Sequence, residues 1–497
     1  MKPETFTLAH ISDLHFSNGL SKDGSHSHSI HHLQQIESIF KDRSFDKVIV
    51  SGDLTNTGDS ESLLRVKNWL LGKFPISSEE QIGLNLPSEI VATIPGNHDA
   101  YNCDNSLGSG WERWQKSIIN YEKVFEPKFI DGCRYDWIEK GGHSLYIVYV
   151  DSCFLGDPTI EHFPDIQRLA ISTINKIARG KLSLRQSRQM LRWFDAGMKG
   201  ELNNPHNDEA SIPKEKFARS FKILVMHHYL FEPEGCPDDF FLQINHRDIV
   251  FRNIALADFD MCLCGHKHIA EFKEFLYGNY FDKRARVKYL MQVFRRFMGI
   301  ETMPFCLLDE DGKKMPRWFT AMVEIIFVKI KANSPKDVPE DEYVNKLIDT
   351  LLSCIRNPAS FVGEIQGFVR NFETRGYELL DQEDLTAIQS KISSELKKTD
   401  RTFLAEFAEE YVKKFVQNIN SRPFIQSMAG SAAKNCKKGD KSRSFNIYSI
   451  ESSDSSVRVL QTKFVLGNKE KEWSELTNEY TFSDYHRLNR KIFSKNA

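Results

Sequence analysis

Long apolar runs are missing from this chain of 497 residues. Its most apolar stretch, Ala321 to Ile330, is interrupted by Glu324 and Lys329, whereas a membrane-spanning helix needs about 20 consecutive apolar residues. The first residues, MKPET, lead directly into a β-like run, without the apolar segment and the small-residue cleavage site of a secretory signal. We therefore expect a protein that neither spans a membrane nor is secreted by that route.

Cysteine is sparse, and neither sign of charge dominates. The nine cysteines are an odd number without a regular interval, which favours reduced thiols in a cytoplasmic protein over a disulfide framework. The chain has 66 Lys and Arg against 68 Asp and Glu, a formal net charge of -2. This balance excludes a histone-like basic protein but not a local basic groove, so nucleic acid as a partner is neither indicated nor dismissed.

The first half of the chain alternates short β-branched segments with segments of helical periodicity, which is the pattern of a layered α/β fold. Apolar residues at helical spacing follow Asp59, and they follow Ser183 again, where a Ser-x-x-Gln capping signal begins. The expected strands are Phe6–Ile11, Lys47–Val50, Val91–Ile94, Leu145–Val150, Lys222–Met226 and Met261–Cys264.

The pattern changes between about residues 340 and 418, where four successive apolar stripes at helical spacing predict a helical bundle. Strand character returns at Phe424–Met428, Phe445–Ile450 and Val457–Val465. Three strands make a poor independent domain, so we expect them to complete the sheets of the first half. The expected segments are 1–275 as the first part of one domain, 276–420 as a mainly helical insertion, 421–470 as the closing strands and 471–497 as a C-terminal tail.

Polar clusters directly follow five of the expected strands. Because ligands of α/β sheets bind beyond the carboxyl ends of strands, we expect these clusters to converge. Carboxylate, imidazole and amide groups together suit Zn, Mn or Fe, and neither an all-oxygen calcium cage nor a thiolate site. Asp53 has two carboxylate oxygens and can bridge two ions. The clusters are Asp13-Leu14-His15, Gly52-Asp53, Gly96-Asn97-His98-Asp99, His227-His228 and Gly265-His266-Lys267-His268.

Taken in this order, the motifs resemble the full set of the calcineurin-like metallophosphoesterase superfamily. The segment Ser51–Gly58 (SGDLTNTG) and the pair Asp151-Ser152 are similar to its branch of cyclic-nucleotide phosphodiesterases. The likeness covers residues 5–270 and resumes near residue 423, where Ala429-Gly430-Ser431 is similar to the closing strands of that branch. The resemblance implies a four-layer α-β-β-α metallophosphoesterase sandwich, interrupted here by an all-α helical subdomain.

The resemblance also implies two divalent or mixed-valence transition-metal ions, of Mn, Fe or Zn. It assigns Asp13, His15, Asp53 and His268 to one ion, and Asp53, Asn97, His227 and His266 to the other. His98, Asn97 and Asp53 are the implied catalytic residues, with His98 beside the leaving group.

One departure from the branch leaves two candidates for a single ligand. The branch usually has proline after the histidine pair, whereas Tyr229-Leu230 follow here. His227 and His228 therefore both stay candidates, and His227 is preferred because it is the first residue after its strand. Asp99 is a candidate to orient a metal-bound histidine, since such an imidazole usually needs its other N–H fixed.

The expected function is hydrolysis of a phosphodiester, in a nucleotide or another small diester, by attack of a metal-activated water. His98 is expected to protonate the leaving alkoxide. One alternative is a metal-dependent nuclease with a helical insert that caps DNA, which the near-neutral charge disfavours. The other is a regulatory protein that has a vestigial metal centre and recruits a protein partner through the insert, which the intact ligand set disfavours. These patterns do not specify the substrate.

Three further patterns are interpreted as structural. The histidine-rich tract 26–32 is expected to be a solvated loop and a helix start. Cys262 and Cys264 are interpreted as small apolar residues of a buried strand. Trp111 and Trp114 are expected to pack a helix, in preference to stacking on a base.

Overall fold

The computed structural model describes residues 4–17, 30–101, 110–153, 182–231, 257–276, 423–432, 443–453, 456–466 and 473–482, together with residues 180, 244, 250 and 254. The chain divides into two compact units, Met1–Phe275 with Pro423–Arg487, and Leu276–Arg422 with Leu488–Ala497. The predicted helical insertion lies outside the described residues. The first unit contains both sheets and every proposed site residue.

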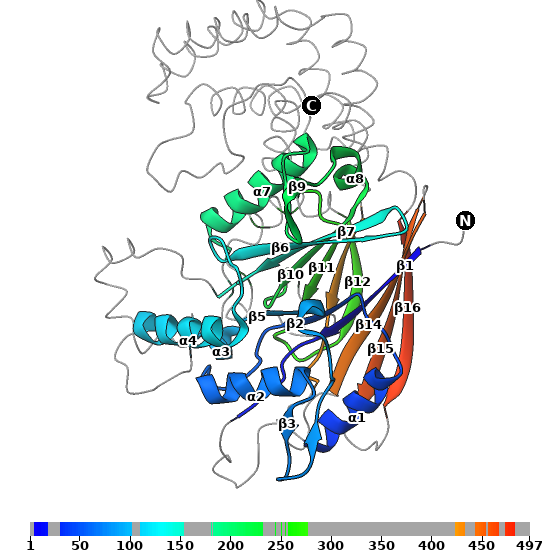
Figure 1. The fold of residues 1–497 in the computed structure, drawn as a ribbon. Coiled ribbons are helices and arrows are strands. Elements are labelled where there is room, and N and C mark those ends of the chain that lie inside the picture. The colour runs from blue at the N-terminus through cyan, green and yellow to red at the C-terminus, as the bar shows by residue number, and fades with distance from the viewer. Residues whose placement is uncertain are drawn as a thin grey trace, which may run out of the picture. The chain divides into compact units, whose positions relative to one another are not determined.

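The first six-stranded sheet joins strands from both ends of the chain in the order β16-β15-β14-β1-β2-β5 (Figure 1). Strands β1, β2 and β5 are parallel, whereas β14 pairs antiparallel with β1, so that Phe6 lies opposite Ile450. The bounds are β1 (Glu4–Ile11), β2 (Lys47–Ser51), β5 (Val91–Ile94), β14 (Arg443–Ser452), β15 (Val457–Leu466) and β16 (Ser474–Phe482).

The second six-stranded sheet has the order β12-β13-β11-β10-β7-β6. Strand β13 lies between β11 and β12 although it follows them by a long stretch of chain, and it pairs in parallel with β11. The bounds are β6 (Cys133–Lys140), β7 (His143–Val150), β10 (Phe221–Met226), β11 (Met261–Cys264), β12 (Glu271–Leu276) and β13 (Pro423–Met428). All nine strands expected from the sequence are therefore confirmed.

The two sheets share one apolar core. Phe6, Leu8 and Ile49 of the first sheet pack in one buried cluster with Ile147 and Ile223 of the second. Alternate residues of the first sheet, such as Ile11 and Val48, face a second cluster that helices cover. This period of two places every other side chain of β1 and β2 between the sheets.

Helices pack on the outer face of each sheet (Figure 1). Leu33 of α1 and Trp69 of α2 are buried against the first sheet. On the second sheet, Phe217 of α8 contacts Tyr146 with ring centroids 4.9 Å apart. The helices are α1 (Ile30–Lys41), α2 (Ser60–Leu70), α3 (Asn97–Tyr101), α4 (Gly110–Phe125), α7 (Leu184–Lys199), α8 (Lys214–Arg219) and the 3-10 turn η1 (Ser88–Ile90).

Local signals account for two helix starts. The Asp59 carboxylate accepts the Ser62 N–H at the start of α2. Ser183 and Gln186 form the expected reciprocal capping box at the start of α7. Two short ribbons complete the unit, β3 (Phe74–Pro75) with β4 (Gln81–Ile82) and β8 (Asn203–Asn204) with β9 (Asn207–Ser211).

The C-terminal region differs from the expected tail at 471–497, because residues 474–482 form β16 at the edge of the first sheet. Most of β16 is exposed, so it lacks the apolar alternation by which half-buried strands are recognised. Cys262 and Cys264 are fully buried in β11, as expected. Trp111 and Trp114 belong to α4, but their side chains lie outside the described residues.

No described helix combines the length and the apolar character that crossing a membrane requires.

The strand order predicts the outcome of two truncations. A chain that ends at residue 276 should aggregate, because β1 loses β14 and β11 loses β13, which leaves unpaired strand edges. Joining residue 276 to residue 423 by a short flexible linker should preserve the fold, since the cost of closing a surface loop depends weakly on its length. Size-exclusion chromatography and thermal unfolding check both. A monodisperse, folded 1–276 fragment would contradict the prediction.

Candidate metal centre

The five polar clusters all stand at the carboxyl ends of strands. They follow β1, β2, β5, β10 and β11, which belong to both sheets. The structure brings together every residue that the resemblance assigns to a metal, in two groups that share Asp53. These residues are Asp13, His15, Asp53, Asn97, His227, His266 and His268.

The backbone at the centre is unusual, because five of these residues have left-handed φ angles. The angles are 54° for Asp13, 52° for His15, 48° for Asp53, 75° for His266 and 54° for His268. Such angles are uncommon for residues other than glycine, and each costs on the order of 1–3 kcal/mol. They let each strand end turn sharply, so that its side chains meet those of the neighbouring clusters.

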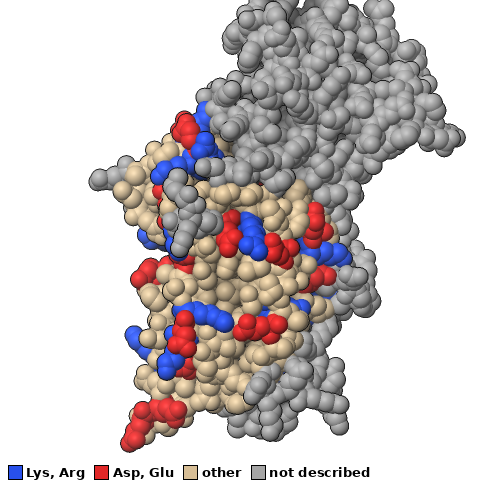
Figure 2. All heavy atoms as spheres, turned by 90° about the vertical axis from the view of Figure 1, so that its right-hand side faces the viewer, with Lys and Arg blue, Asp and Glu red and all other residues tan. Residues whose placement is uncertain are grey.

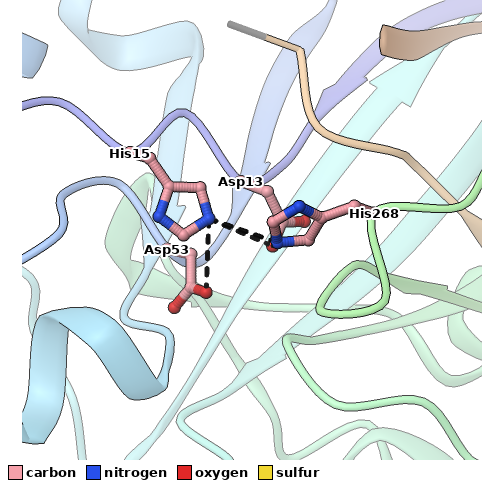
Figure 3. A group of neighbouring side chains, drawn as sticks. All are labelled: Asp13, His15, Asp53 and His268. Atoms are coloured by element: carbon pink, nitrogen blue, oxygen red, sulfur yellow. Dashed lines mark hydrogen bonds and ion pairs between the residues drawn. The ribbon is translucent and has the colours of Figure 1, made fainter. Parts of the chain in front are cut away.

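The first group consists of Asp13, His15, Asp53 and His268, whose ligand atoms all lie within 4.8 Å of one another (Figure 3). His268 Nε2 lies 3.2 Å from both His15 Nε2 and Asp13 Oδ1. His15 Nε2 is 3.8 Å from Asp53 Oδ2. Imidazole nitrogens and carboxylate oxygens therefore surround one point.

Asn56 decides which nitrogen of His15 faces this point. The Nδ1 of His15 lies 2.8 Å from the side-chain oxygen of Asn56, which can only accept, so this nitrogen carries the proton. The lone pair on Nε2 then faces Asp13 and Asp53. The sequence does not indicate this role, because Asn56 stands within the SGDLTNTG motif and nothing in its spacing points to His15 as a partner.

The second group consists of Asp53, His227 and His266, with the Asn97 amide beside them. His227 Nδ1 donates to the Ser51 carbonyl at 2.8 Å, which turns Nε2 toward the group. That Nε2 lies 3.1 Å from Asn97 Oδ1 and 3.4 Å from Asp53 Oδ1. His266 Nδ1 is also 3.1 Å from His227 Nε2.

The geometry favours His227 over His228 as the ligand of this group. The Nδ1 of His228 pairs with the Ser152 hydroxyl at 2.8 Å. The ring of His228 also packs closely against Gly180, where a Cβ would collide with it. His228 therefore supports the wall of the centre, whereas His227 faces Asp53.

The donor set fits a pair of cations. Asp13 Oδ1 and His266 Nε2 are buried and have no hydrogen-bond partner, which is costly unless a ligand satisfies them. Lone pairs of imidazole, carboxylate and amide groups also face one another at 3–4 Å, an arrangement that is repulsive unless positive charge lies between them.

The pKa shifts report the same demand for positive charge. Burial lowers the pKa of His227, but the Asp53 carboxylate outweighs it and raises that pKa to about 9. Burial and the neighbouring His227 lower the pKa of His266 to about 3. Burial opposes ionisation of Asp53, yet its neighbours His227 and His98 hold its pKa well below the usual range. A proton on His227 thus partly replaces a metal ion in neutralising the carboxylates.

His98 lies at the open side of the centre. Its side chain is 35% exposed, whereas those of Asp13, His15, Asp53 and His227 are almost fully buried. Its N–H donates to Asp53 Oδ1 at 2.9 Å, and its Nε2 lies 4.0 Å from Asp53 Oδ2. His98 is therefore held against the centre while its ring remains accessible to a bound molecule.

Asp99 does not orient a histidine, so that prediction is wrong. Its two oxygens accept the N–H groups of Leu54, Thr55 and Gly96 at 2.8–2.9 Å, and one also accepts the Thr55 hydroxyl. Burial and the charge of Asp53 raise the pKa of Asp99 to about 6. Asp99 therefore joins the loop after β2 to the loop after β5, because its oxygens accept main-chain N–H groups and the Thr55 hydroxyl rather than an imidazole N–H.

Gly52 and Gly96 permit the close approach of these loops. Gly52 has a φ of 96°, and a Cβ there would lie 2.5 Å from His227 Nδ1. A Cβ on Gly96 would overlap the backbone N and the Oδ1 of Asp53. Any side chain at either position would displace a proposed ligand.

Comparison with known proteins agrees with this geometry. The calcineurin-like phosphoesterase family matches residues 6–270, more than half of the chain, and the chain belongs to this family. Its members are hydrolases of phosphoester bonds that use a dinuclear metal centre. No curated protein matches the chain.

Solved structures also match, and one of them is described as GAP50, the anchor in the inner membrane complex of Plasmodium. The two chains are 11% identical, and the match covers 54% of this chain and 68% of that one. With a TM-score of 0.28, we infer nothing about this protein from that likeness.

Replacement of Asp99 by asparagine should destabilise the loops around Asp53. In either orientation, the new NH₂ group faces at least one main-chain N–H that the carboxylate had accepted. An unsatisfied buried donor costs about 1–3 kcal/mol. Chemical denaturation at pH 8, where wild-type Asp99 is ionised, measures the loss. An unchanged free energy of unfolding would show that Asp99 does not hold these loops.

Two asparagine substitutions separate the adjacent histidines. In both His227→Asn and His228→Asn the amide can replace Nδ1 and keep its hydrogen bond, so that only Nε2 is removed. His227→Asn should lose about one metal ion per chain, whereas His228→Asn should keep wild-type metal content. Elemental analysis after dialysis gives both numbers. The opposite result would make His228 the ligand.

Proposed function

We propose that this protein is a dinuclear metal-dependent phosphoesterase that hydrolyses a phosphodiester in a nucleotide or another small diester. The two oxygens of Asp53 carry the proposal, because Oδ2 faces His15 in the first group while Oδ1 faces His227 in the second. A single carboxylate placed in this way can hold two ions. The first ion would have Asp13, His15, Asp53 and His268 as ligands, and the second Asp53, Asn97, His227 and His266.

When bound, two Mn, Fe or Zn ions supply Lewis acidity that activates a water and stabilises charge on the phosphate oxygens. The chain's own residues arrange the site. Asn56 and the Ser51 carbonyl hold His15 and His227 with Nε2 facing inward. Asn97 offers a neutral oxygen beside Asp53, which adds a ligand without adding negative charge near an anionic substrate.

His98 is the proposed proton donor to the leaving alkoxide. The exposure of its side chain leaves room for a substrate. The hydrogen bond from its main-chain N–H to Asp53 Oδ1 fixes its distance from the two groups of proposed metal ligands that share Asp53. Its Nδ1 lies 3.4 Å from the Asn56 carbonyl, which favours a proton on that nitrogen when the ring is neutral. Nε2 is then the nitrogen that would hold the donated proton, in the form of the ring that carries a proton on both nitrogens.

We further propose a branch of the family, a layer architecture and a cellular location for this protein. The SGDLTNTG segment supports the branch of cyclic-nucleotide phosphodiesterases. Two sheets with a shared core and helices on their outer faces support a four-layer α-β-β-α sandwich interrupted by a helical insertion. The described cysteines, all buried and without a disulfide bond, support a cytoplasmic location.

A small substrate is favoured over DNA by the charge. The face shown in Figure 2 has Lys and Arg interleaved with Asp and Glu, without a basic stripe that would follow a nucleic-acid backbone. Ion pairs such as Arg458 with Glu479 neutralise charges on the first sheet. The intact ligand set argues in the same way against a vestigial centre.

Metal analysis and a substrate panel test the proposed function. Protein reconstituted with Mn²⁺ should bind two ions per chain and hydrolyse bis-p-nitrophenyl phosphate or a cyclic mononucleotide faster than p-nitrophenyl phosphate. Preference for single- or double-stranded DNA would establish the nuclease instead. Full activity with at most one ion per chain would rule out the dinuclear centre, and two bound ions without hydrolysis of any substrate would rule out the enzyme.

His98→Ala should lower turnover by about 10²–10⁴-fold, the usual contribution of a general acid, and leave metal content intact. The defect should shrink for a p-nitrophenolate leaving group, which needs little protonation, compared with an alkyl or ribose leaving group. Steady-state rates on matched diesters give the ratio. Loss of metal from His98→Ala would place His98 among the ligands.

A further inference from the structure

Asp13 is held at each of its polar groups except one. Its N–H donates to the Gly52 carbonyl at 3.0 Å, and its Oδ2 accepts the His266 N–H at 3.1 Å. Its carbonyl accepts the Ser431 hydroxyl at 2.7 Å. The remaining oxygen, Oδ1, has no hydrogen bond and faces His268. These contacts lock the left-handed backbone of Asp13 and present one oxygen to the centre.

Ser431 comes from a distant part of the chain. It follows β13, beyond the matched residues 6–270, and it is 1% exposed. Ser12 and Ser431 form a parallel β-bridge, in which the Ala432 N–H donates to the Ser12 carbonyl at 3.2 Å. The segment 431–432 therefore runs beside the Asp13 loop and contacts it through main chain and side chain.

We propose that Ser431 is a positioning residue of the metal centre, which fixes the peptide of Asp13 so that Oδ1 points at the first metal ion. The inference rests on the proposed function, because it assumes that Asp13 binds an ion. The segment after the insertion then belongs to the working centre as well as to the sheets. The matched residues 6–270 alone hold the ligands but lack the group that sets the angle of Asp13.

The physical reason is the left-handed turn at Asp13, where φ is 54°. Without the Ser431 hydroxyl the Asp13 carbonyl is buried and unpaired, so the peptide gains by rotating toward another donor. Rotation of this peptide moves the carboxylate away from His15 and His268. Loss of an outer partner of a metal ligand typically costs 10–100-fold in metal affinity.

A neighbouring serine supplies a matched control. Ser444 is also 1% exposed, and its N–H donates to the Ser431 carbonyl, but its hydroxyl has no hydrogen-bond partner. Ser431→Ala and Ser444→Ala thus each delete one buried serine hydroxyl, from two residues that are hydrogen-bonded to each other through the main chain. Only the first deletion removes a contact with Asp13.

The test compares Mn²⁺ affinity of the full metal-free chain by calorimetry, and the absorption spectrum after loading with Co²⁺. Ser431→Ala should bind one of its two ions, the one held by Asp13, roughly 10–100-fold less tightly than wild type. Its absorption spectrum with Co²⁺ should also differ from that of wild type. Ser444→Ala should keep affinities within about twofold, and Ser431→Thr, which retains a hydroxyl, should recover most of the affinity.

The outcomes separate this inference from the proposed function. Equal affinities and spectra for wild type, Ser431→Ala and Ser444→Ala would overturn the role of Ser431 while leaving the metal centre intact. Equal losses in both alanine variants would overturn it as well, because the effect would be one of packing. Wild-type protein that binds no Mn²⁺ or Co²⁺ would overturn the proposed function itself. If Ser431→Ala fails to fold, Ser431→Cys, a weaker donor of similar size, is compared with Ser431→Thr by the same criteria.

Discussion

Mutual repulsion between lone pairs is the constraint on which this structure depends. Carboxylate, imidazole and amide acceptors from both sheets meet around Asp53 at separations of 3.1–3.8 Å. Only positive charge makes such an arrangement favourable, and the pKa of about 9 at His227 expresses that need. The left-handed turns, the two glycines and the buried partners all hold these groups closer than they would approach by themselves.

Hydrogen bonds and packing around the centre stabilise its strained backbone and its closely spaced acceptors. Left-handed backbone at Asp13 and Asp53 persists because main-chain and side-chain hydrogen bonds fix both loops. Asp99 connects the loops after β2 and β5 through four accepted hydrogen bonds. The strands that carry these loops are held in place by the apolar core that the two sheets share. Geometry at the centre is thus a property of the whole unit, including the strands that follow the insertion.

Position in the fold separates the roles of similar residues. His227 and His228 are adjacent, yet one faces Asp53 and the other binds Ser152. Asp13 and Asp99 are both buried carboxylates, but Asp13 has one oxygen without a hydrogen bond, whereas both oxygens of Asp99 accept main-chain N–H groups. Burial alone therefore does not distinguish a ligand from a support, whereas the partner of each oxygen or nitrogen does.

The sequence alone determined the strands that bury apolar residues, and it determined the clusters that follow them, because a short β-branched run and the position after a strand are local properties. It did not reveal β16, whose exposed residues carry no apolar period. The partners of Asp99, Asn56 and Ser431 were also decided only by tertiary structure. Each of these side chains meets a group that lies far away in the sequence, and such pairings depend on which strands become neighbours.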